Sequence, residues 1–347
     1  MSSAIVRAHR LVEGEVFAER YETLGFVGQG AMGSVYRVRD RETQDVVALK
    51  VMNADLASSP EFVARFLLEA KVGERIANDH VVRVLDSNVD PKTKLPYFAM
   101  EMLEGEDLHH RLERGPELER ADAVSLLRQL FAAMAAAHDA SVVHRDLKPE
   151  NLFLVRSPNG SLDLKVLDFG VAKVVRETTH SGTAPGLGTP LWAAPEQGAE
   201  NQQIRATSDV WALGLLTFRL LARRIFWRAA NQARANAFDL AVEMLREPIP
   251  LASERCRQLG IPELGAAFDR WFERAVQRDP AKRFPNAKAA WSALEAVLEG
   301  QPAKVVAGPA AVSPMVATRG PGSRRHWWAL GLLCVAAMAI VVWLSLR

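Results

Sequence analysis

The chain is poor in cysteine and carries almost no net charge. Its two cysteines, Cys256 and Cys334, lie far apart in the sequence, so they can build neither a disulfide framework nor a zinc site. The simplest interpretation is a reducing, cytoplasmic location for the main domain. The formal net charge is only +2, so we expect no nucleic-acid partner. Residues 1–20 also lack the apolar run of a signal peptide.

What the chain does contain is enough apolar side chains for substantial cores. Hydrophobic residues make up 49% of its 347 residues, and charged residues make up 24%. This composition is sufficient for one large lobe or two smaller ones. We expect a loose N-terminal arm over residues 1–19, a main domain over residues 20–299, and a linker rich in Pro, Ala and Gly over residues 300–326.

One octet places an acid, a cation and an amide in a single short loop. Residues 144–151 read His-Arg-Asp-Leu-Lys-Pro-Glu-Asn. Asp146 can orient an attacking hydroxyl and accept its proton, Lys148 can neutralise charge on a moving phosphoryl group, and Asn151 can bind a metal through its carbonyl oxygen. Phosphoryl transfer needs these three chemistries side by side and no covalent enzyme nucleophile. The octet therefore predicts a phosphoryl-transfer site.

A second acid follows a predicted hairpin. Residues 151–154 and 162–167 show the pattern of two strands joined by a Ser-Pro-Asn-Gly turn. Asp168 stands at the end of the second strand, before Phe169 and Gly170. A carboxylate in this position can bind a magnesium ion that bridges nucleotide phosphates.

Glycines near the start of the main domain lie between two predicted strands. Gly28, Gly30 and Gly33 have the spacing G-x-G-x-x-G, which alone could equally indicate a dinucleotide-binding fold. The residues after Gly33 favour a strand rather than a helix, and a strand–loop–strand hairpin lets backbone amides lie over phosphates. The next strand, residues 46–50, ends in Lys50. We expect a helix over residues 61–76 to supply its acid partner.

Together these motifs resemble the protein kinase family. The octet and the Asp-Phe-Gly triplet match its catalytic loop and metal-binding segment. Residues 20–299 are similar to bacterial eukaryotic-like (Hanks-type) serine/threonine kinases. The resemblance implies an α+β, bilobal protein-kinase fold, with a β-rich lobe over residues 20–102, a helical lobe over residues 103–299, and ATP between them. Lys148 after Asp146 is the serine/threonine form of the loop, so protein Ser and Thr hydroxyls are the expected acceptors.

The resemblance also assigns site residues. Asp146 and Lys148 are implied to be catalytic, and Asn151 and Asp168 to bind Mg²⁺ or Mn²⁺. Glu69 is implied to pair with Lys50, in preference to Glu61 and Glu74. Val35 would cover the adenine, Met100 would line the back of its pocket, backbone groups of Glu101 and Met102 would bind its edge, and Asp107 would reach a ribose hydroxyl. The implied ATP contacts are Val27, Gly28, Gly30, Gly33, Val35, Ala48, Lys50, Glu69, Met100, Glu101, Met102 and Asp107.

Other implied roles are structural. Asp209 would hold the backbone of the catalytic loop, and Arg283 would pair with Glu196. The sequence departs from the family pattern at Gly73, where an apolar residue is usual; we expect the glycine to weaken its helix. A second departure covers residues 222–236, where a short Gly-Pro loop is usual. That segment is either a docking face or an amphipathic packing segment, and packing is the favoured interpretation.

Two other functions remain open at this point. One is a pseudokinase that acts as a membrane scaffold, which the presence of Lys50, Asp146, Asn151 and Asp168 disfavours. ATP hydrolysis and autophosphorylation would separate it from an active kinase. The other is a small-molecule kinase of similar fold, which would lack the segment 189–196 that resembles a peptide-binding floor.

The C-terminal region contains an uncharged run of membrane-spanning length. Residues 327–346 carry no charge and match a hydrocarbon core of about 30 Å. Arg319, Arg324 and Arg325 precede the run, and only Arg347 follows it. The positive-inside rule therefore predicts a single-pass helix in the cell membrane, with the kinase domain in the cytoplasm.

Hydroxyl residues in the loop 171–188 suggest how activity is controlled. Thr178, Thr179, Ser181 and Thr183 are candidates for phosphorylation, with Thr183 favoured. A phosphate there could pair with Arg145 and order the site. Confinement to a membrane raises the local concentration of neighbouring copies, so we expect autophosphorylation in trans, with a homodimer as a possible partner arrangement.

Overall fold

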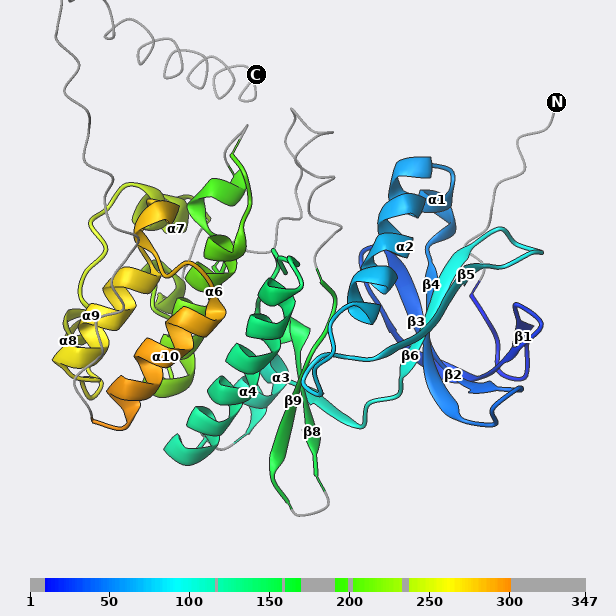
Figure 1. Ribbon diagram of the computed structural model, residues 1–347, viewed down its shortest axis with the longest axis horizontal. Coiled ribbons are helices and arrows are strands. Elements are labelled where there is room, and N and C mark those ends of the chain that lie inside the picture. Colours follow the sequence, from blue (N-terminus) through cyan, green and yellow to red (C-terminus); the bar gives the residue numbers. More distant parts are fainter. Residues whose placement is uncertain are drawn as a thin grey trace, which may run out of the picture. The chain divides into compact units, whose positions relative to one another are not determined.

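The computed structural model describes residues 10–115, 118–157, 160–169, 191–198, 202–232 and 237–300 (Figure 1). They belong to one compact unit, Met1–Lys304. The phosphorylation candidates of the loop 171–188, Gly170 and the expected span 327–346 lie outside the described residues. Among the residues that are described, no helix is long and apolar enough to cross a membrane.

The first lobe is built on a six-stranded antiparallel sheet with the strand order β1-β2-β3-β4-β6-β5. Alternate side chains of each strand point to opposite faces. One face packs a core that includes Tyr21, Tyr36 and Leu49, and the other packs Met52 and Phe98 against helix α2. The strands are β1 (Val16–Phe17), β2 (Tyr21–Gln29), β3 (Gly33–Asp40), β4 (Val46–Met52), β5 (Val84–Val89) and β6 (Pro96–Glu101).

Strand β1 corrects the expected N-terminal arm. Val16 and Phe17 pair with Glu22 and Tyr21 of β2, and Phe17 is buried with its ring edge-on to Tyr97 at 5.4 Å. The arm prediction is therefore wrong for this part of residues 1–19. A strand of two residues is too short to show a period in the sequence, and the burial of Phe17 holds it to the sheet.

Two helices complete the first lobe, α1 (Ala54–Ala57) and α2 (Pro60–Glu74). Pro60 suits the first turn of α2, because its missing N–H would have no partner there. Phe66 and Ala70 are spaced by one helical turn and are fully buried. Figure 1 shows α1 and α2 together on one side of the sheet. The side of α2 that faces the sheet therefore carries both the core residues and Glu69.

The second lobe is helical, as expected, with one small sheet. The sheet consists of β7 (Gly105–Asp107), β8 (Leu152–Arg156) and β9 (Leu162–Val166). The helices are α3 (Leu108–Arg114), α4 (Arg120–Asp139), α6 (Ala206–Ala222), α7 (Ala237–Leu245), α8 (Ala252–Leu259), α9 (Ala266–Ala275) and α10 (Ala287–Leu298). Short 3₁₀ turns are η1 (Pro149–Asn151), η2 (Pro195–Gly198), η3 (Ala229–Asn231) and η4 (Pro280–Lys282).

Helix α6 lies at the centre of this lobe. Most of its side chains are buried, including Trp211, Leu213 and Phe218. A helix that is apolar on all sides belongs inside a core, and α4, α9 and α10 pack against it. Because α6 is enclosed in this way, Asp209 in its first turn is held at a fixed position.

A short backbone connection joins the two lobes. Val81 forms a parallel bridge with Val166 of β9. Val82 N donates to Val166 O at 3.1 Å, and Val166 N donates to His80 O at 2.8 Å. The segment that leads into β5 is therefore fastened to the small sheet of the helical lobe.

Candidate active site

Lys50 bridges the two lobes through two carboxylates. Its Nζ donates to Glu69 Oε1 at 2.7 Å and to Asp168 Oδ1 at 2.8 Å. β4 lies between β3 and β6, so Lys50 projects from an inner strand and is buried. Glu69 comes from α2, and Asp168 follows β9. The pair between Lys50 and Glu69 that the sequence predicts is present, whereas the competitor Glu61 pairs with Arg65 on its own helix.

The contact of one lysine with two carboxylates shifts the pKa values of all three groups. Burial raises the pKa of Glu69 to about 7, since the charge of Lys50 only partly offsets the loss of water. Burial alone would lower the pKa of Lys50, but the charges of Asp168 and Glu69 raise it above its ordinary value. For Asp168, whose side chain is half-exposed, the partial loss of water would raise the pKa, but the charge and the hydrogen bond of Lys50 together lower it. Asp168 is therefore the carboxylate that remains ionised beside the lysine.

The backbone of residues 144–145 is fixed by Asp209. Its carboxylate accepts the N–H of His144 at 2.8 Å and the N–H of Arg145 at 2.9 Å. His138 Nε2 donates to the same carboxylate at 3.0 Å. Arg145 has φ 68, a left-handed conformation that is costly for a side chain of this size. The hydrogen bonds to Asp209 stabilise that conformation, as expected for its scaffold role.

Asp146, Lys148 and Asn151 are brought together by this loop. Lys148 Nζ lies 2.8 Å from Asp146 Oδ2. Asn151 Nδ2 donates to the backbone carbonyl of Asp146 at 2.7 Å and to its Oδ2 at 3.2 Å. The amide nitrogen of Asn151 is thereby turned toward Asp146. Its oxygen, the atom that a metal would bind, is on the other branch of the amide.

Residues 167–169 connect the loop to the lysine bridge. Leu167 N donates to Asn151 O, and His144 Nε2 donates to Leu167 O, both at 2.9 Å. The ring of His144 lies 4.8 Å from that of Phe169, and burial lowers its pKa. Asp168 itself has φ 43. A strained backbone at a carboxylate that faces a lysine is typical of a functional site.

The glycine-rich segment between β2 and β3 contains two kinds of glycine. A Cβ on Gly33 would lie 2.5 Å from Val51 O, so the close approach of β3 to β4 requires glycine there. A Cβ on Gly28 would meet nothing within 4 Å, and one on Gly30 would meet only Gly33 O at 3.6 Å. Packing therefore does not demand glycine at these two positions, and both leave room above the backbone for a ligand.

The apolar residues expected in the nucleotide site come from four strands. Val35 of β3 is the register partner of Lys50, and Ala48 is the partner of Met100 across β4 and β6. Ala48 is buried, whereas Val35 and Met100 are partly exposed and Val27 is exposed. The structure thus places these apolar side chains on β2, β3, β4 and β6, and Ala48 shares strand β4 with the lysine.

Two expected ligand contacts have structural partners of their own. The N–H of Glu101 donates to Arg83 O at 3.0 Å, so that donor is already engaged. Met102 follows β6 and is partly buried. Asp107 is the N-cap of α3, because Oδ1 accepts the N–H of His110 at 2.9 Å and Oδ2 contacts the His110 ring at 2.6 Å. The predicted ribose contact of Asp107 stays a prediction.

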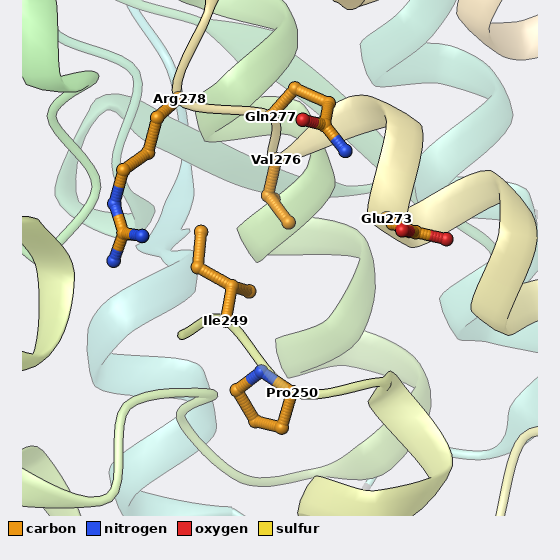
Figure 2. A pocket seen from close by; sticks show the side chains of 6 residues that line it. All are labelled: Ile249, Pro250, Glu273, Val276, Gln277 and Arg278. Carbon is orange, nitrogen blue, oxygen red and sulfur yellow. The ribbon is translucent and has the colours of Figure 1, made fainter. Parts of the chain in front are cut away.

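A hollow elsewhere in the helical lobe is unrelated to these groups. It measures about 210 Å³ and is lined by the six residues labelled in Figure 2. Its most basic side chain, Arg278, donates to the carbonyls of Met244 and Glu247 at the end of α7. The hollow therefore lies where helices of this lobe pack together, and none of the predicted site residues lines it.

The protein kinase domain family matches residues 21–292 of the chain. The chain belongs to the protein kinase family. The kinase domain that matches thus contains both lobes and every predicted catalytic and metal-binding residue.

Relatives of this kinase domain include two bacterial proteins. The serine/threonine-protein kinase pkn3 of Myxococcus xanthus is 34% identical over 289 residues, which cover 82% of this chain and 51% of pkn3. The serine/threonine-protein kinase PknL of Mycobacterium tuberculosis is 34% identical over 83% of this chain and 68% of its own length. The chain therefore spans about half the length of pkn3.

A solved structure supports the fold. The crystal structure of the Mycobacterium tuberculosis PknI kinase domain superimposes with a TM-score of 0.61 at 24% sequence identity. The match covers 83% of this chain and the whole of that chain. The bilobal kinase fold is thereby established for the described residues.

The first departure from the family pattern, Gly73, lies within α2, which ends one residue later at Glu74. A Cβ on Gly73 would lie 2.8 Å from Val84 Cγ2, so the glycine allows α2 to approach β5 closely. The expected weakening of the helix stays a prediction, since glycine is about 1 kcal/mol less favourable than alanine in a helix. Val84 occupies the space that a larger side chain would need.

Sequence reasoning missed two residues of the kinase site. Gln197 Nε2 donates to Arg145 O at 2.5 Å, and Gln197 Oε1 accepts the N–H of Ala194 at 2.9 Å. His138 donates to Asp209 and accepts the N–H of Ala287 at 3.0 Å. The sequence signal that could have identified Gln197 was its place directly after Glu196. No local motif marks His138. Glu196 and Arg283 form the expected buried ion pair, with nitrogen–oxygen distances of 2.7 and 2.8 Å.

Proposed function

We propose that this chain is an ATP-dependent serine/threonine protein kinase, which transfers the γ-phosphoryl group of ATP to Ser or Thr hydroxyls of protein substrates. The observation that carries the proposal is the contact of Lys148 and Asn151 with Asp146, at 2.8 and 2.7 Å. Membership of the protein kinase family and the similarity to bacterial serine/threonine-protein kinases support it.

The catalytic roles follow from the chemistry of the cluster. Asp146 orients the substrate hydroxyl and accepts its proton as the hydroxyl attacks. Lys148, already beside Asp146, neutralises negative charge on the phosphoryl group during transfer. Asp209 keeps the backbone of the loop in place through His144 and Arg145. The protein thus supplies position and charge, which is what phosphoryl transfer requires.

The residues present fit a divalent metal, Mg²⁺ or Mn²⁺. Such an ion would neutralise negative charge on the phosphates of the nucleotide. Asp168 offers a half-exposed carboxylate, and Asn151 offers an amide oxygen. Both are hard oxygen donors. Among the residues described, no group of three or more His, Cys, Asp or Glu side chains could hold a metal alone, and magnesium commonly takes one or two protein ligands together with substrate phosphates.

The nucleotide is proposed to lie beneath the glycine-rich segment. Gly28 and Gly30 leave open space above their backbone, so amide groups can approach phosphates there. Lys50 would hold the α- and β-phosphates, and Glu69 fixes the position of the lysine at 2.7 Å. Val35 and Met100 would contact the adenine.

Asp146→Asn tests the proposal directly. The variant should bind ATP normally and lose roughly two to four decades of phosphorylation rate, the range for a lost general base. Asp139→Asn is the matched control, because this aspartate is exposed at the end of α4. Purified wild-type protein that neither hydrolyses ATP nor phosphorylates Ser/Thr peptides would instead favour the pseudokinase scaffold.

We also propose a membrane anchor over residues 327–346. The support is the length of the uncharged run and the arginines that precede it. The kinase domain would then be cytoplasmic at the cell membrane. Deletion of residues 327–347 should move the protein to the soluble fraction and leave it active. Recovery of the full chain from the soluble fraction alone would contradict the anchor.

Activation by autophosphorylation in trans is the last part of the proposal. It rests on the hydroxyl residues at 178–183 and on Arg145, which precedes Asp146. Tagged Asp146→Asn protein mixed with active enzyme in liposomes should acquire phosphate on these residues. Absence of that phosphate, while the active copy is fully active, would rule the mechanism out.

A further inference from the structure

The segment that departs from the family pattern, residues 222–236, is anchored in the core. Phe226 and Trp227 are each only 1% exposed. Arg223 ends α6 with φ 60, the left-handed conformation that glycine usually supplies at a helix C-terminus. Arg223 also donates to Leu118 O at 2.8 Å. The described part of the segment is therefore a fixed structure rather than a docking surface.

Trp227 carries a polar contact to a distant part of the chain. Its ring stacks on Trp211 at 6.1 Å and meets Phe226 edge-on at 5.1 Å. Its indole N–H donates to the backbone carbonyl of Leu191 at 2.9 Å. A phenylalanine could fill the same space but could not make this hydrogen bond.

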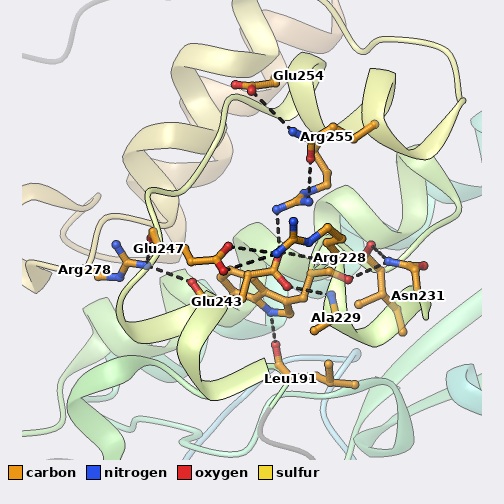
Figure 3. A network of polar contacts seen from close by, with 12 residues as sticks. Leu191, Arg228, Ala229, Asn231, Glu243, Glu247, Glu254, Arg255 and Arg278 are labelled. Carbon is orange, nitrogen blue, oxygen red and sulfur yellow. Dashed lines mark hydrogen bonds and ion pairs between the residues drawn. The ribbon is translucent and has the colours of Figure 1, made fainter. Parts of the chain in front are cut away.

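A buried ion pair fixes the backbone on the C-terminal side of Trp227. Glu243 of α7 accepts the N–H groups of Arg228 and Ala229, both at 2.8 Å. Arg255 of α8 pairs with Glu243 at 2.6 Å, and both side chains are at most 4% exposed. Figure 3 shows this network around Arg228. Because a buried charge must keep its partner, Trp227 is held by a rigid support.

The acceptor of the Trp227 hydrogen bond belongs to a segment that contacts the catalytic loop through another of its residues. Leu191 opens the described segment 191–198, the part that resembles a peptide-binding floor. Within it, Gln197 holds Ala194 N and donates to Arg145 O, one residue before Asp146. One end of this segment is thus tied to the catalytic loop and the other to Trp227.

We propose that Trp227 is a positioning residue for the protein substrate: its indole N–H fixes the Leu191 carbonyl and with it the floor on which the acceptor peptide lies. The inference rests on the proposed kinase function. The hydrogen bonds of Asp209 hold the catalytic loop independently of Trp227. Loss of the indole N–H should therefore weaken peptide binding more than it slows transfer.

Trp227→Phe in the full chain tests this, with Trp271→Phe as the matched control. Trp271 also donates its indole N–H to a backbone carbonyl, Ala290 O, at the same 2.9 Å, but between α9 and α10. The two variants lose the same kind of hydrogen bond. The substrate is a synthetic serine peptide selected from a degenerate library with the wild-type protein.

Trp227→Phe should raise the KM for the peptide about five-fold, the equivalent of about 1 kcal/mol for one neutral hydrogen bond. Its KM for ATP and its kcat should stay within about two-fold of wild type. Trp271→Phe should lower the melting temperature similarly and leave the peptide KM unchanged. Equal peptide KM values for the two variants would overturn the inference, whereas an inactive wild type would overturn the proposed function instead.

Asn231→Ala keeps the test decisive if Trp227→Phe does not fold. Asn231 is exposed, and its amide donates to the carbonyls of Ile225 at 2.7 Å and Trp227 at 2.8 Å. Its removal should loosen the backbone of Trp227 without touching the core, and should raise the peptide KM about two- to three-fold. A peptide KM equal to that of wild type would count against the inference.

Discussion

Replacement of Gly73 by alanine tests how α2 is held against β5. The new Cβ would lie 2.8 Å from Val84 Cγ2, a distance that Cβ atoms in proteins essentially never show. Val84 is β-branched, so its methyl groups cannot swing away freely. Either Val84 leaves its preferred rotamer or α2 moves outward, and α2 carries Glu69 one turn earlier.

Two opposing effects set how much Gly73→Ala changes the stability of α2. Alanine is favoured over glycine in a helix interior by about 1 kcal/mol, whereas overpacking costs about 1–3 kcal/mol. We therefore expect Gly73→Ala to destabilise α2 by about 1 kcal/mol. With Val84→Ala in the same chain, the clash disappears and the helix preference remains. The coupling energy between the two substitutions should then equal the relieved overpacking, about 1–3 kcal/mol in favour of the double variant.

Amide hydrogen exchange of α2 peptides is the suitable assay. The first tryptophan in the sequence is Trp192, so tryptophan fluorescence does not report on the β-rich lobe. Val84→Thr is the control, because threonine keeps the branched shape and should not rescue Gly73→Ala. Additive effects of Gly73→Ala and Val84→Ala, or equal rescue by threonine, would refute the clash with Val84.

Further outcomes concern the core ion pair and the glycine-rich segment. Burial would raise the pKa of Glu196, but the hydrogen bonds and charge of Arg283 lower it. The stabilisation from this ion pair is therefore present above about pH 4.5 and is lost as the pH falls through the pKa of Glu196 in the folded protein. Melting temperatures measured between pH 3 and 6 will show this loss. Arg283→Met should cost about 3–5 kcal/mol by leaving Glu196 buried without its partner, and it should flatten that pH dependence. Gly33→Ala should destabilise the protein by about 2 kcal/mol or more through contact with Val51 O, whereas Gly28→Ala should leave denaturant stability within about 0.5 kcal/mol and weaken ATP binding in calorimetry.

The sequence predicted the elements whose pattern is local. Strand β4 begins at Val46 as expected, and the expected helix over residues 61–76 is α2, which ends at Glu74. The pair between Lys50 and Glu69 was also predictable, because the resemblance to the kinase family favoured Glu69 over its competitors Glu61 and Glu74. In each case the signal lies within one element, where periodicity and motif spacing are informative.

What the sequence could not provide depends on elements meeting in space. The role of Gly73 requires knowledge that Val84 of β5 lies across from it, and the acceptor of Trp227 lies 36 residues earlier in the chain. Asp107 is different, because an aspartate before Leu108 is a recognisable N-cap signal. The family resemblance implied a ribose contact for Asp107, and the N-cap role was not predicted. Prediction failed where packing, rather than pattern, decides the role of a residue.

The bridge between Val81 and Val166 has a consequence for biosynthesis. Translation delivers the β-rich lobe first, but the backbone partners of residues 80–82 lie roughly 85 residues downstream. At about 5–20 residues per second, the ribosome needs about 4–17 seconds to supply them. During that interval the N–H of Val82 and the carbonyl of His80 lack their partner, Val166. The nascent chain therefore passes through a state in which strand β5, at the edge of its sheet, is open to wrong pairing or to a chaperone.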